Sequence, residues 1–408
     1  MEQIIKKEGF VDFFLLAFVL LWSGGSFTYG LFPGWPYIML VLTMIVMFSR
    51  QQKLESFNYI AVGILSAVIF LQNVAFSGTI DVMIKPIVTL LAVTAIAIVV
   101  RPHFNRLFVK IVTFFALISL VFWVIDVFPT GHSALLRIAK SLPQLGSDIL
   151  AKGDNSWAQR SGYTLYFYSI YEIQYSADSF YFFSVRNPGP FYEPGRFTVI
   201  LSIALMLILY NGQYKKYQKS FYVILAANIT TFSTTGYFTM LAIWAFYFFS
   251  RRRNNGISSI IWIILFFIVI RYALDLSFMS EKVSVQLDDV EDANSRFGAM
   301  LYHWTQILES PFIGYGVFLS QTFSILEMSP NGITDMMRYW GIPVFLLCVW
   351  LAFYSTKTYM INSVVFRLAF VTVLLLLAYS QTIMNSPFYY LLYFIGSEKY
   401  LYEKRSKV

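Results

Sequence analysis

Apolar residues fill most of the chain in uninterrupted stretches, each close to the length that a helix needs to cross a bilayer, about 20 residues. Such runs lie near residues 10–30, 34–48, 57–76, 82–100, 108–128, 191–211, 220–235, 236–250, 257–274, 331–354, 362–380 and 384–396. Hydrophobic residues make up 58% of the 408 residues, charged residues 13%, and the mean hydropathy is +0.63, which excludes an ordinary soluble domain. The sequence therefore predicts an all-α polytopic integral membrane protein with about twelve transmembrane helices.

Basic residues cluster in alternate connections between these runs, which is typical of the cytoplasmic side of a membrane protein. The clusters are Lys6 and Lys7, Arg50 and Lys53, Arg101 to Lys110, Lys215 to Lys219, Arg251 to Arg253, Lys357 and Arg367, and Lys399 to Lys407. This alternation predicts that both termini are cytoplasmic and that the first run stays in place as an anchor. The net charge of +8 is then mostly a topology signal and gives no support to a nucleic-acid partner. The single cysteine, Cys348, excludes disulfides and cysteine metal clusters.

The same topology leaves two long segments on the external side, at 129–190 and 275–330. They separate N-terminal helices (1–128), central helices (191–274) and C-terminal helices with a cytoplasmic tail (331–408). In the first segment, residues 132–142 predict an amphipathic helix lying in the membrane interface, ended by Pro143. Residues 163–175 and 180–185 are aromatic and β-branched, so they either pair as strands or lie flat on the bilayer. Their tyrosines favour the headgroup level, or offer rings and hydroxyls to sugars.

The stretch from Arg186 to Arg196 concentrates charge, proline and glycine directly before an apolar run. Pro194 suits the first turn of a helix and leaves Glu193 near its N-cap. A helix N-terminus attracts anions, and Arg186 and Arg196 add donors suited to phosphate, so we expect a diphosphate site at the membrane surface. The alternative is that Arg196 pairs with Glu193 and that Arg186 binds lipid phosphate.

The second external segment begins with acidic residues and then becomes helical. Asp288 and Asp289 resemble a metal-binding pair, although adjacent acids in a polar loop are usually just solvated. Within a predicted helix over residues 295–308, Arg296 and His303 share one face. His303 is a candidate general base, or else a hydrogen-bonded structural residue. We expect Pro311 to Gly316 to break this helix, and Ser329 to Gly332 to cap the next one.

Several of these motifs together resemble one family of membrane enzymes. Arg186-Asn-Pro-Gly-Pro-Phe-Tyr-Glu-Pro194 is similar to the R-x-x-G-x-F-x-x-P signature of the superfamily of O-antigen polymerases and O-antigen ligases, which are bacterial membrane glycosyltransferases. Further along, the family has the pattern SR … P-L-x-G-x-G … H-N … E-x-G-x-x-G. This chain resembles its four parts, in the same order, at Ser295-Arg296, Pro311 to Gly316, Asn331-Gly332 and Trp340 to Pro343. Phe232 to Gly236 falls where the family has a small polar motif. The resemblance covers residues 183–345.

The resemblance implies an inner-membrane polymerase of GT-C-like glycosyltransferase architecture, with its active site on the periplasmic side. Donor and acceptor would both be oligosaccharide repeat units linked to undecaprenyl diphosphate, joined with inversion, without cofactor or metal. Membrane lipids, and possible chain-length regulator proteins, would be the other partners. Arg186 and Arg296 match the family's arginines and would bind the diphosphate together with Arg196. Tyr192 and Asn331 complete the predicted substrate contacts.

One departure from the family separates its two branches. Ligases have a catalytic histidine where this chain has Asn331, which favours the polymerase branch, since asparagine cannot act as a base. Proton removal then falls to Glu193 or His303. A lipid-linked oligosaccharide flippase or other transporter, a ligase, and an assembly partner remain alternatives. Transporters usually show related halves, and no internal repeat is evident in this sequence.

Overall fold

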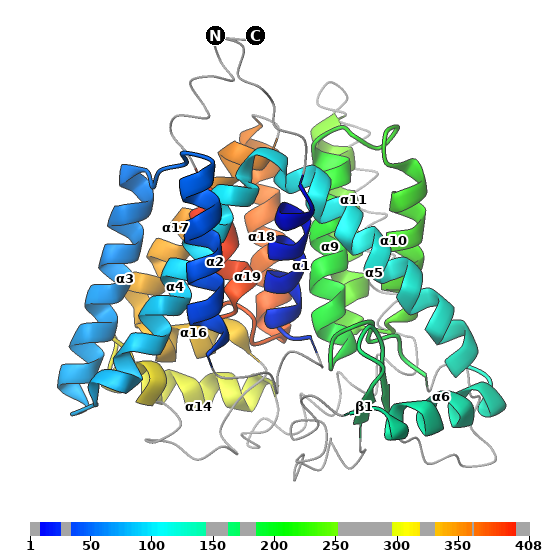
Figure 1. Ribbon diagram of the computed structural model, residues 1–408, viewed down its shortest axis with the longest axis horizontal. Helices are drawn as coiled ribbons and strands as arrows, with labels where there is room; N and C mark the ends of the chain where they lie inside the picture. Colours follow the sequence, from blue (N-terminus) through cyan, green and yellow to red (C-terminus); the bar gives the residue numbers. More distant parts are fainter. Residues whose placement is uncertain are drawn as a thin grey trace.

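The computed structural model describes residues 9–25, 34–143, 162–171, 185–251, 296–318, 331–360 and 363–396. They form a bundle of helices with one small hairpin (Figure 1). The elements are α1 (Phe10–Trp22), α2 (Trp35–Ser49), α3 (Ser56–Ala75), α4 (Ile80–Val100), η1 (Arg101–His103), α5 (Phe104–Asp126), α6 (Pro129–Ser141), β1 (Gly162–Thr164), β2 (Ser169–Tyr171), α9 (Pro194–Tyr210), α10 (Gln218–Thr230), α11 (Thr234–Arg251), α14 (Arg296–Glu309), η2 (Gly316–Phe318), α16 (Gly332–Trp340), α17 (Ile342–Tyr359), α18 (Val364–Ser380) and α19 (Pro387–Phe394).

Several helices have a length and composition compatible with embedding in a membrane. Within the described ranges, three helical stretches are long and apolar enough to cross a bilayer: Ser56–Ala75, Ile80–Asp126 and Ile342–Tyr359. Shorter apolar helices accompany them: Phe10–Trp22, Trp35–Ser49, Pro194–Tyr210 and Val364–Ser380. The fold is therefore mostly helical and compatible with a membrane protein.

The predicted apolar runs coincide with helices, with one break that the sequence analysis did not include. The run at 331–354 divides into α16 and α17 at Gly341, whose φ of 81° belongs to the left-handed region. A Cβ at this position would collide with the carbonyl oxygen of Phe312, so only glycine fits. The run at 257–274 lies outside the described residues.

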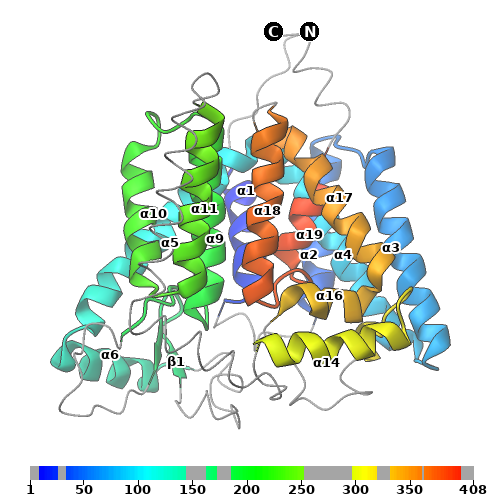
Figure 2. The ribbon, with the colours of Figure 1, turned by 180° about the vertical axis from the view of Figure 1, so that it is seen from behind.

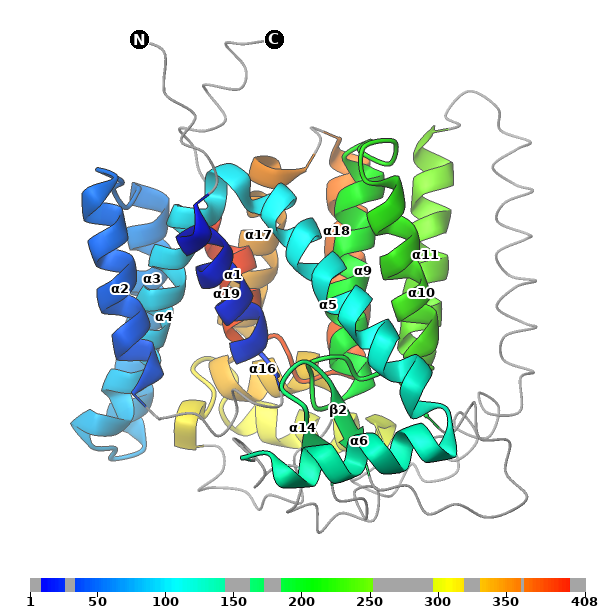
Figure 3. The same ribbon diagram turned by 45° about the vertical axis from the view of Figure 1, so that its right-hand side comes forward.

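Two short helices, α1 and α19, lie in the middle of the bundle (Figures 1 and 2). They contact each other, and both contact α4. On one side α2 and α3 pack against α4, and on the other α9 packs against α5, α10, α11 and α18 (Figure 3). The side chains of α9 are almost all buried, so this helix is the core of its half.

Among the described residues, several of the basic residues that the sequence assigns to the cytoplasm lie at one end of the bundle. Arg50 follows α2 and Arg101 follows α4, while Arg251 ends α11, and all three helix ends lie at the top in Figure 1. Arg101 binds Glu55 at 2.8 Å and donates to the carbonyl oxygen of Gly396 at 2.8 Å. We call this end the Arg101 face.

Short elements cover the opposite end, which we call the α14 face, where α6, the hairpin, α14 and α16 lie across the ends of the long helices (Figures 1 and 3). The structure confirms the helix predicted over residues 132–142, which begins earlier, at Pro129. The strands pair antiparallel, Gly162 opposite Tyr171 and Thr164 opposite Ser169. The hairpin therefore spans residues 162–171 and overlaps the first part of the predicted stretch 163–175, whereas Val185 is not in a strand and residues 172–184 lie outside the described ranges.

Candidate functional site

The stretch that begins with Arg186 is anchored in the bundle by its neighbour Asn187, which is fully buried. The Asn187 amide donates to the hydroxyls of Ser119 at 3.2 Å and Thr230 at 2.9 Å, and its oxygen accepts from the backbone of Gly189 at 3.1 Å. Half-buried Arg186 donates from Nε to the carbonyl oxygen of Thr231 at 3.1 Å. The α10–α11 turn, which contains the start of the small polar motif Phe232 to Gly236, thus holds the Arg186 segment in place.

Helix α9 begins at Pro194, as predicted, with Glu193 as its N-cap in extended conformation. The Glu193 carboxylate accepts a hydrogen bond from the Gln381 amide at 3.0 Å. Arg196 donates to the carbonyl oxygen of Ser23 at 3.2 Å and to the hydroxyl of Thr382 at 3.2 Å. No ion pair among the described residues joins Arg196 to Glu193, so the simple pairing of these two residues is not found.

The Arg196 guanidinium is a half-buried cation held by neutral groups. Besides its hydrogen bonds to oxygens, it lies 4.5 Å from the centre of the Tyr192 ring. Its Nε is buried without a hydrogen-bond partner. A Cβ on Gly24 would lie 2.9 Å from its Cδ, which shows how closely the chain after α1 covers this side chain.

Two irregular segments meet beside Arg196 inside the bundle. The first is the end of α1, where Gly25 forms an isolated bridge with Phe191. The second connects α18 to α19, where Gln381 is 4% and Ile383 3% exposed. They are joined because the backbone N–H of Phe388 donates to the Ser23 hydroxyl at 2.7 Å. Irregular backbone at the depth of apolar helices is tolerated where it lies within protein or lines a polar cavity.

Helix α16 brings a second group of charges to the same place. Its N-cap is Asn331, whose side-chain oxygen accepts from the backbone of Ile333 at 3.1 Å and Thr334 at 3.3 Å, as the predicted cap requires. Arg338, only 1% exposed, donates to Asp335 at 3.1 Å and, from α16 to α14, to Gln306 at 2.6 Å.

The α9 and α16 groups meet around the segment between α18 and α19. A Cβ on Gly332 would collide with the carbonyl oxygen of Gln381, whose side chain binds Glu193. Burial raises the pKa of the Asp335 carboxyl, while Arg338, Asn385 and Arg196 act to lower it. Asp335 therefore lies within electrostatic reach of Arg196 as well as of its own partner.

The β-hairpin adds a phenol on the other side of the α9 group. Burial raises the pKa of the Tyr171 hydroxyl, Glu193 and Tyr192 raise it further, and Arg186 lowers it. The hydroxyl is therefore close enough to Glu193 and Arg186 to feel both charges, and it stays protonated at neutral pH. Tyr171 can donate a hydrogen bond there.

A backbone clamp holds α16 in position. Two backbone hydrogen bonds join the turn after α14 to the α16–α17 junction. The N–H of Tyr315 donates to the carbonyl oxygen of Arg338 at 2.8 Å, and the N–H of Ile342 donates to the carbonyl oxygen of Pro311 at 2.7 Å. Gly314 has a φ of 63°, and a Cβ there would lie 2.5 Å from the Arg338 carbonyl oxygen. These contacts give the predicted helix-breaking segment, Pro311 to Gly316, a positioning role.

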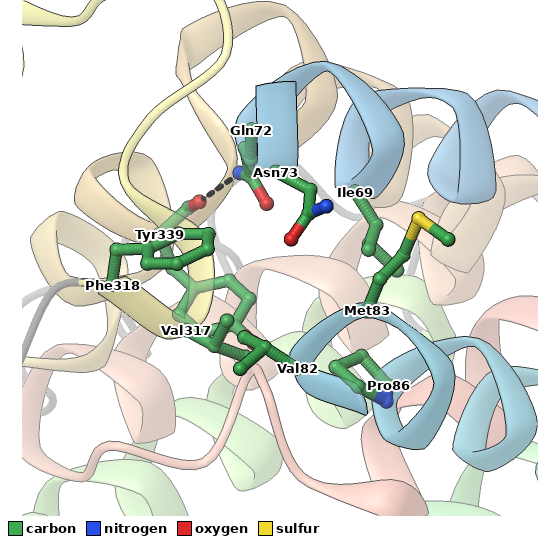
Figure 4. A pocket seen from close by; sticks show the side chains of 9 residues that line it. All are labelled: Ile69, Gln72, Asn73, Val82, Met83, Pro86, Val317, Phe318 and Tyr339. Atoms are coloured by element: carbon green, nitrogen blue, oxygen red, sulfur yellow. Dashed lines mark hydrogen bonds between the residues drawn. The ribbon is translucent and has the colours of Figure 1, made fainter. Parts of the chain in front are cut away.

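Gln72 of α3 closes the clamp from outside. Its amide donates to the carbonyl oxygens of Ile313 at 2.5 Å and Tyr339 at 2.7 Å (Figure 4). A narrow crevice between α3, α4, η2 and α16, with no room for a water molecule, adjoins it. The side chains that line it are Ile69, Gln72, Asn73, Val82, Met83, Pro86, Val317, Phe318 and Tyr339.

The remaining predicted site residues have different surroundings. His303 is 0% exposed and contacts the Thr334 hydroxyl through Nδ1 at 2.8 Å, which ties α14 to α16. Arg296 is the first residue of α14, and its side chain lies outside the described part of the structure, as do Asp288 and Asp289. Across the described ranges, no group of three or more His, Cys, Asp or Glu side chains is placed to hold a metal ion.

Sequence reasoning did not select Asp335, Arg338, Gln381 or Tyr171. A signal existed for the first two, because ionisable residues within an apolar run mark functional sites in membrane proteins. No local pattern distinguishes Gln381, whose importance comes from a contact with a residue far away in the chain. Comparisons of the chain with protein-family models, with curated proteins and with solved structures each find no match.

Proposed function

We propose that this protein is a bacterial inner-membrane glycosyltransferase that polymerises oligosaccharide repeat units carried on undecaprenyl diphosphate. The α14 face would be periplasmic and the Arg101 face cytoplasmic, and the basic clusters of the sequence predict that both termini are cytoplasmic as well. The proposal rests on the resemblance described above and on one structural observation. Residues 186–196 and 331–343 meet at the segment after α18, where Gln381 contacts both Glu193 and Gly332, and residues 311–316 bind the 338–342 part of the second segment.

The charges of this site suit a diphosphate. Arg196 is half-buried, and its hydrogen bonds in the described structure go to neutral oxygens, so an incoming anion would complete its coordination. Helices α9 and α19 both begin beside it, and helix N-termini favour negative charge. Arg186 would bind the same leaving group from the hairpin side, and Arg296 from α14.

In the proposed reaction, a hydroxyl of the acceptor repeat unit attacks C1 of the donor's reducing-end sugar. The bond between C1 and the diphosphate oxygen breaks with inversion, and undecaprenyl diphosphate leaves with the electron pair. Arg196 and Arg186 would stabilise the negative charge that develops on the leaving oxygen, which is usually the largest catalytic contribution. Positive charge from the arginines would take the part that a metal ion has in other glycosyltransferases.

Glu193 is the better candidate of the two predicted bases. It is half-buried beside Arg196 and Tyr171, where an acceptor hydroxyl would have to approach, and the Gln381 amide orients its carboxylate. His303 is fully buried at the α14–α16 contact, so we assign it a positioning role. Tyr192 would contact the substrate. Asn331 would hold the start of α16.

The length of the surface polysaccharide tests this proposal. A deletion strain is complemented with wild type, Arg196→Ala, Arg186→Ala or Arg137→Ala at matched protein levels; Arg137 is an exposed control on α6. Single repeat units on the lipid anchor in the deletion strain and in the first two variants, with long chains in the Arg137 variant, support a polymerase. Loss of the single-unit product would indicate a flippase or ligase instead.

A further inference from the structure

Helix α14 presents two opposed faces. One faces α16 and is buried, with His303 at 0%, Gln306 at 2% and Ile307 at 0% exposure. The other is apolar and open, with Leu301 at 49% and Leu308 at 60% exposure, and Trp304 lies beside them at 48%. Because successive residues turn by about 100° in a helix, Leu301, Trp304 and Leu308 form one stripe opposite the buried face.

A polar edge borders this stripe. Thr305 and Glu309 are exposed and follow Leu301 and Leu308 around the helix, on the side away from Trp304. The helix therefore has a buried face, an open apolar stripe and a polar edge. Such a division is typical of helices that lie in the plane of a membrane interface.

The apolar stripe continues onto a helix that is long enough to cross a membrane. Phe312, 74% exposed, extends the stripe past the end of α14. The hydrogen bond between Ile342 and Pro311 brings it to the start of α17, whose exposed Leu346 and Trp350 follow at 58% and 52%. Exposed apolar side chains thus lie both on α14, which lies across the bundle, and on α17, which begins beside the end of α14 and is long enough to cross a membrane (Figure 2).

We propose that α14 lies in the interfacial layer of the bilayer, with Leu301, Trp304, Leu308 and Phe312 among the lipid headgroups and upper acyl chains. Indole rings favour this depth, and Thr305 and Glu309 face water. The buried face of the same helix binds Arg338 through Gln306 and Thr334 through His303. Contact with the lipid surface therefore fixes the helix that positions the α16 charges. This inference does not depend on the reaction proposed above.

Spin-label accessibility in lipid vesicles tests the orientation of α14. Nitroxide labels are placed at Leu301→Cys, Trp304→Cys, Leu308→Cys, Thr305→Cys and Glu309→Cys, one per protein, with buried Cys348 left in place. We expect the ratio of oxygen to nickel-chelate accessibility to be several-fold higher at positions 301, 304 and 308 than at 305 and 309.

Two results would overturn the proposal. A ratio that is equally low at all five positions would mean that water covers the stripe. Labels at 301, 304 and 308 that are immobile and inaccessible to both reagents would mean that protein covers it, such as a second copy of the chain. All five positions are on the exposed side of α14, away from its direct contacts with α16; the label at position 309 also removes the hydrogen bond that the Tyr315 hydroxyl donates to Glu309 at 2.9 Å.

Discussion

The side-chain amide of Gln381 donates to the carboxylate of Glu193 at 3.0 Å, across 188 positions of sequence. The backbone of Gln381 lies against Gly332, the first residue of α16. One residue thus touches the start of the helix that carries Arg196 and the start of the helix that carries Arg338. We regard this contact as the centre of the proposed site.

Removing the Gln381 amide should impair activity more than stability. In Gln381→Met the side chain keeps about the same volume, but the Glu193 carboxylate loses the hydrogen-bond donor that orients it. We therefore expect the rate of polymerisation to fall by about tenfold or more. Polysaccharide length and the thermal unfolding midpoint are measured together. Gln213→Met, at the opposite face, is the control and should behave as wild type. Unchanged chain length in Gln381→Met would show that Glu193 needs no such support.

Gln72 should stabilise the backbone clamp through its two hydrogen bonds. Gln72→Leu removes the hydrogen bonds to Ile313 and Tyr339, and leaves two carbonyl oxygens with one partner fewer. We expect the free energy of unfolding to fall by about 2 kcal/mol, at about 1 kcal/mol for each bond. Asn73→Leu, which removes a hydrogen bond within its own loop, should cost less. Equal losses in the two variants would contradict a role for Gln72 in holding α16.

His303 should tolerate a substitution that keeps its hydrogen bond. An asparagine can donate to the Thr334 hydroxyl but cannot take up a proton, so His303→Asn should keep most of the activity, whereas His303→Ala should lose it. The dependence of the rate on pH should be the same in wild type and His303→Asn. A His303→Asn variant with a much lower rate, whose residual activity lacks the acidic limb of the profile, would instead identify His303 as the base.

Tyr168 should make the stability of the segment that contains α6 and the hairpin pH-dependent. Its hydroxyl donates to Asp126 at 2.8 Å, and Asp126 binds His132 of α6 at 2.7 Å, so the three residues join the hairpin, α5 and α6. Burial, and then Asp126, raise the pKa of Tyr168 well above its ordinary 10.0. The unfolded chain therefore loses this proton first, and the stabilisation is full below pH 10 and decreases as the pH rises further.

Tyr168→Phe tests this directly. The variant should lose about 1.5–3 kcal/mol of unfolding free energy at neutral pH, the typical value for a hydrogen bond to a charged group. Its unfolding free energy should also depend less on pH than that of wild type above pH 10, where the ordinary tyrosine titrates. Parallel pH curves for the two proteins would show that the Tyr168 proton is not linked to folding.

The sequence predicted those parts of the fold that depend on local chemistry. Hydrophobic period and proline position are sufficient for α6 and for the start of α9 at Pro194, and an Asn side chain before a helix is sufficient for the cap of α16. The break at Gly341 was missed because continuous hydrophobicity across 331–354 reads as one helix. The need for a residue without a Cβ at this position comes from the close approach of the Phe312 backbone, which is distant in sequence.

The candidate site was predictable in one half and hidden in the other. Arg186, Glu193 and Arg196 are close together in sequence, so the sequence alone could place them around the start of α9. Arg338 and Gln381 enter the site through contacts between distant helices, which a single sequence does not encode as a pattern. His303 could be placed on a helix face from its spacing, but its complete burial depends on how α14 packs against α16.

The most direct test of the proposed function uses the purified protein in lipid vesicles with an undecaprenyl diphosphate-linked repeat unit as its single substrate. We predict a ladder of lipid-linked products that grow by whole repeat units, with release of one undecaprenyl diphosphate for each bond formed. Arg196→Ala should abolish both products, while Arg137→Ala should give the wild-type ladder. Substrate that crosses the bilayer without growing in length, or a full ladder from Arg196→Ala, would contradict a polymerase built around Arg196.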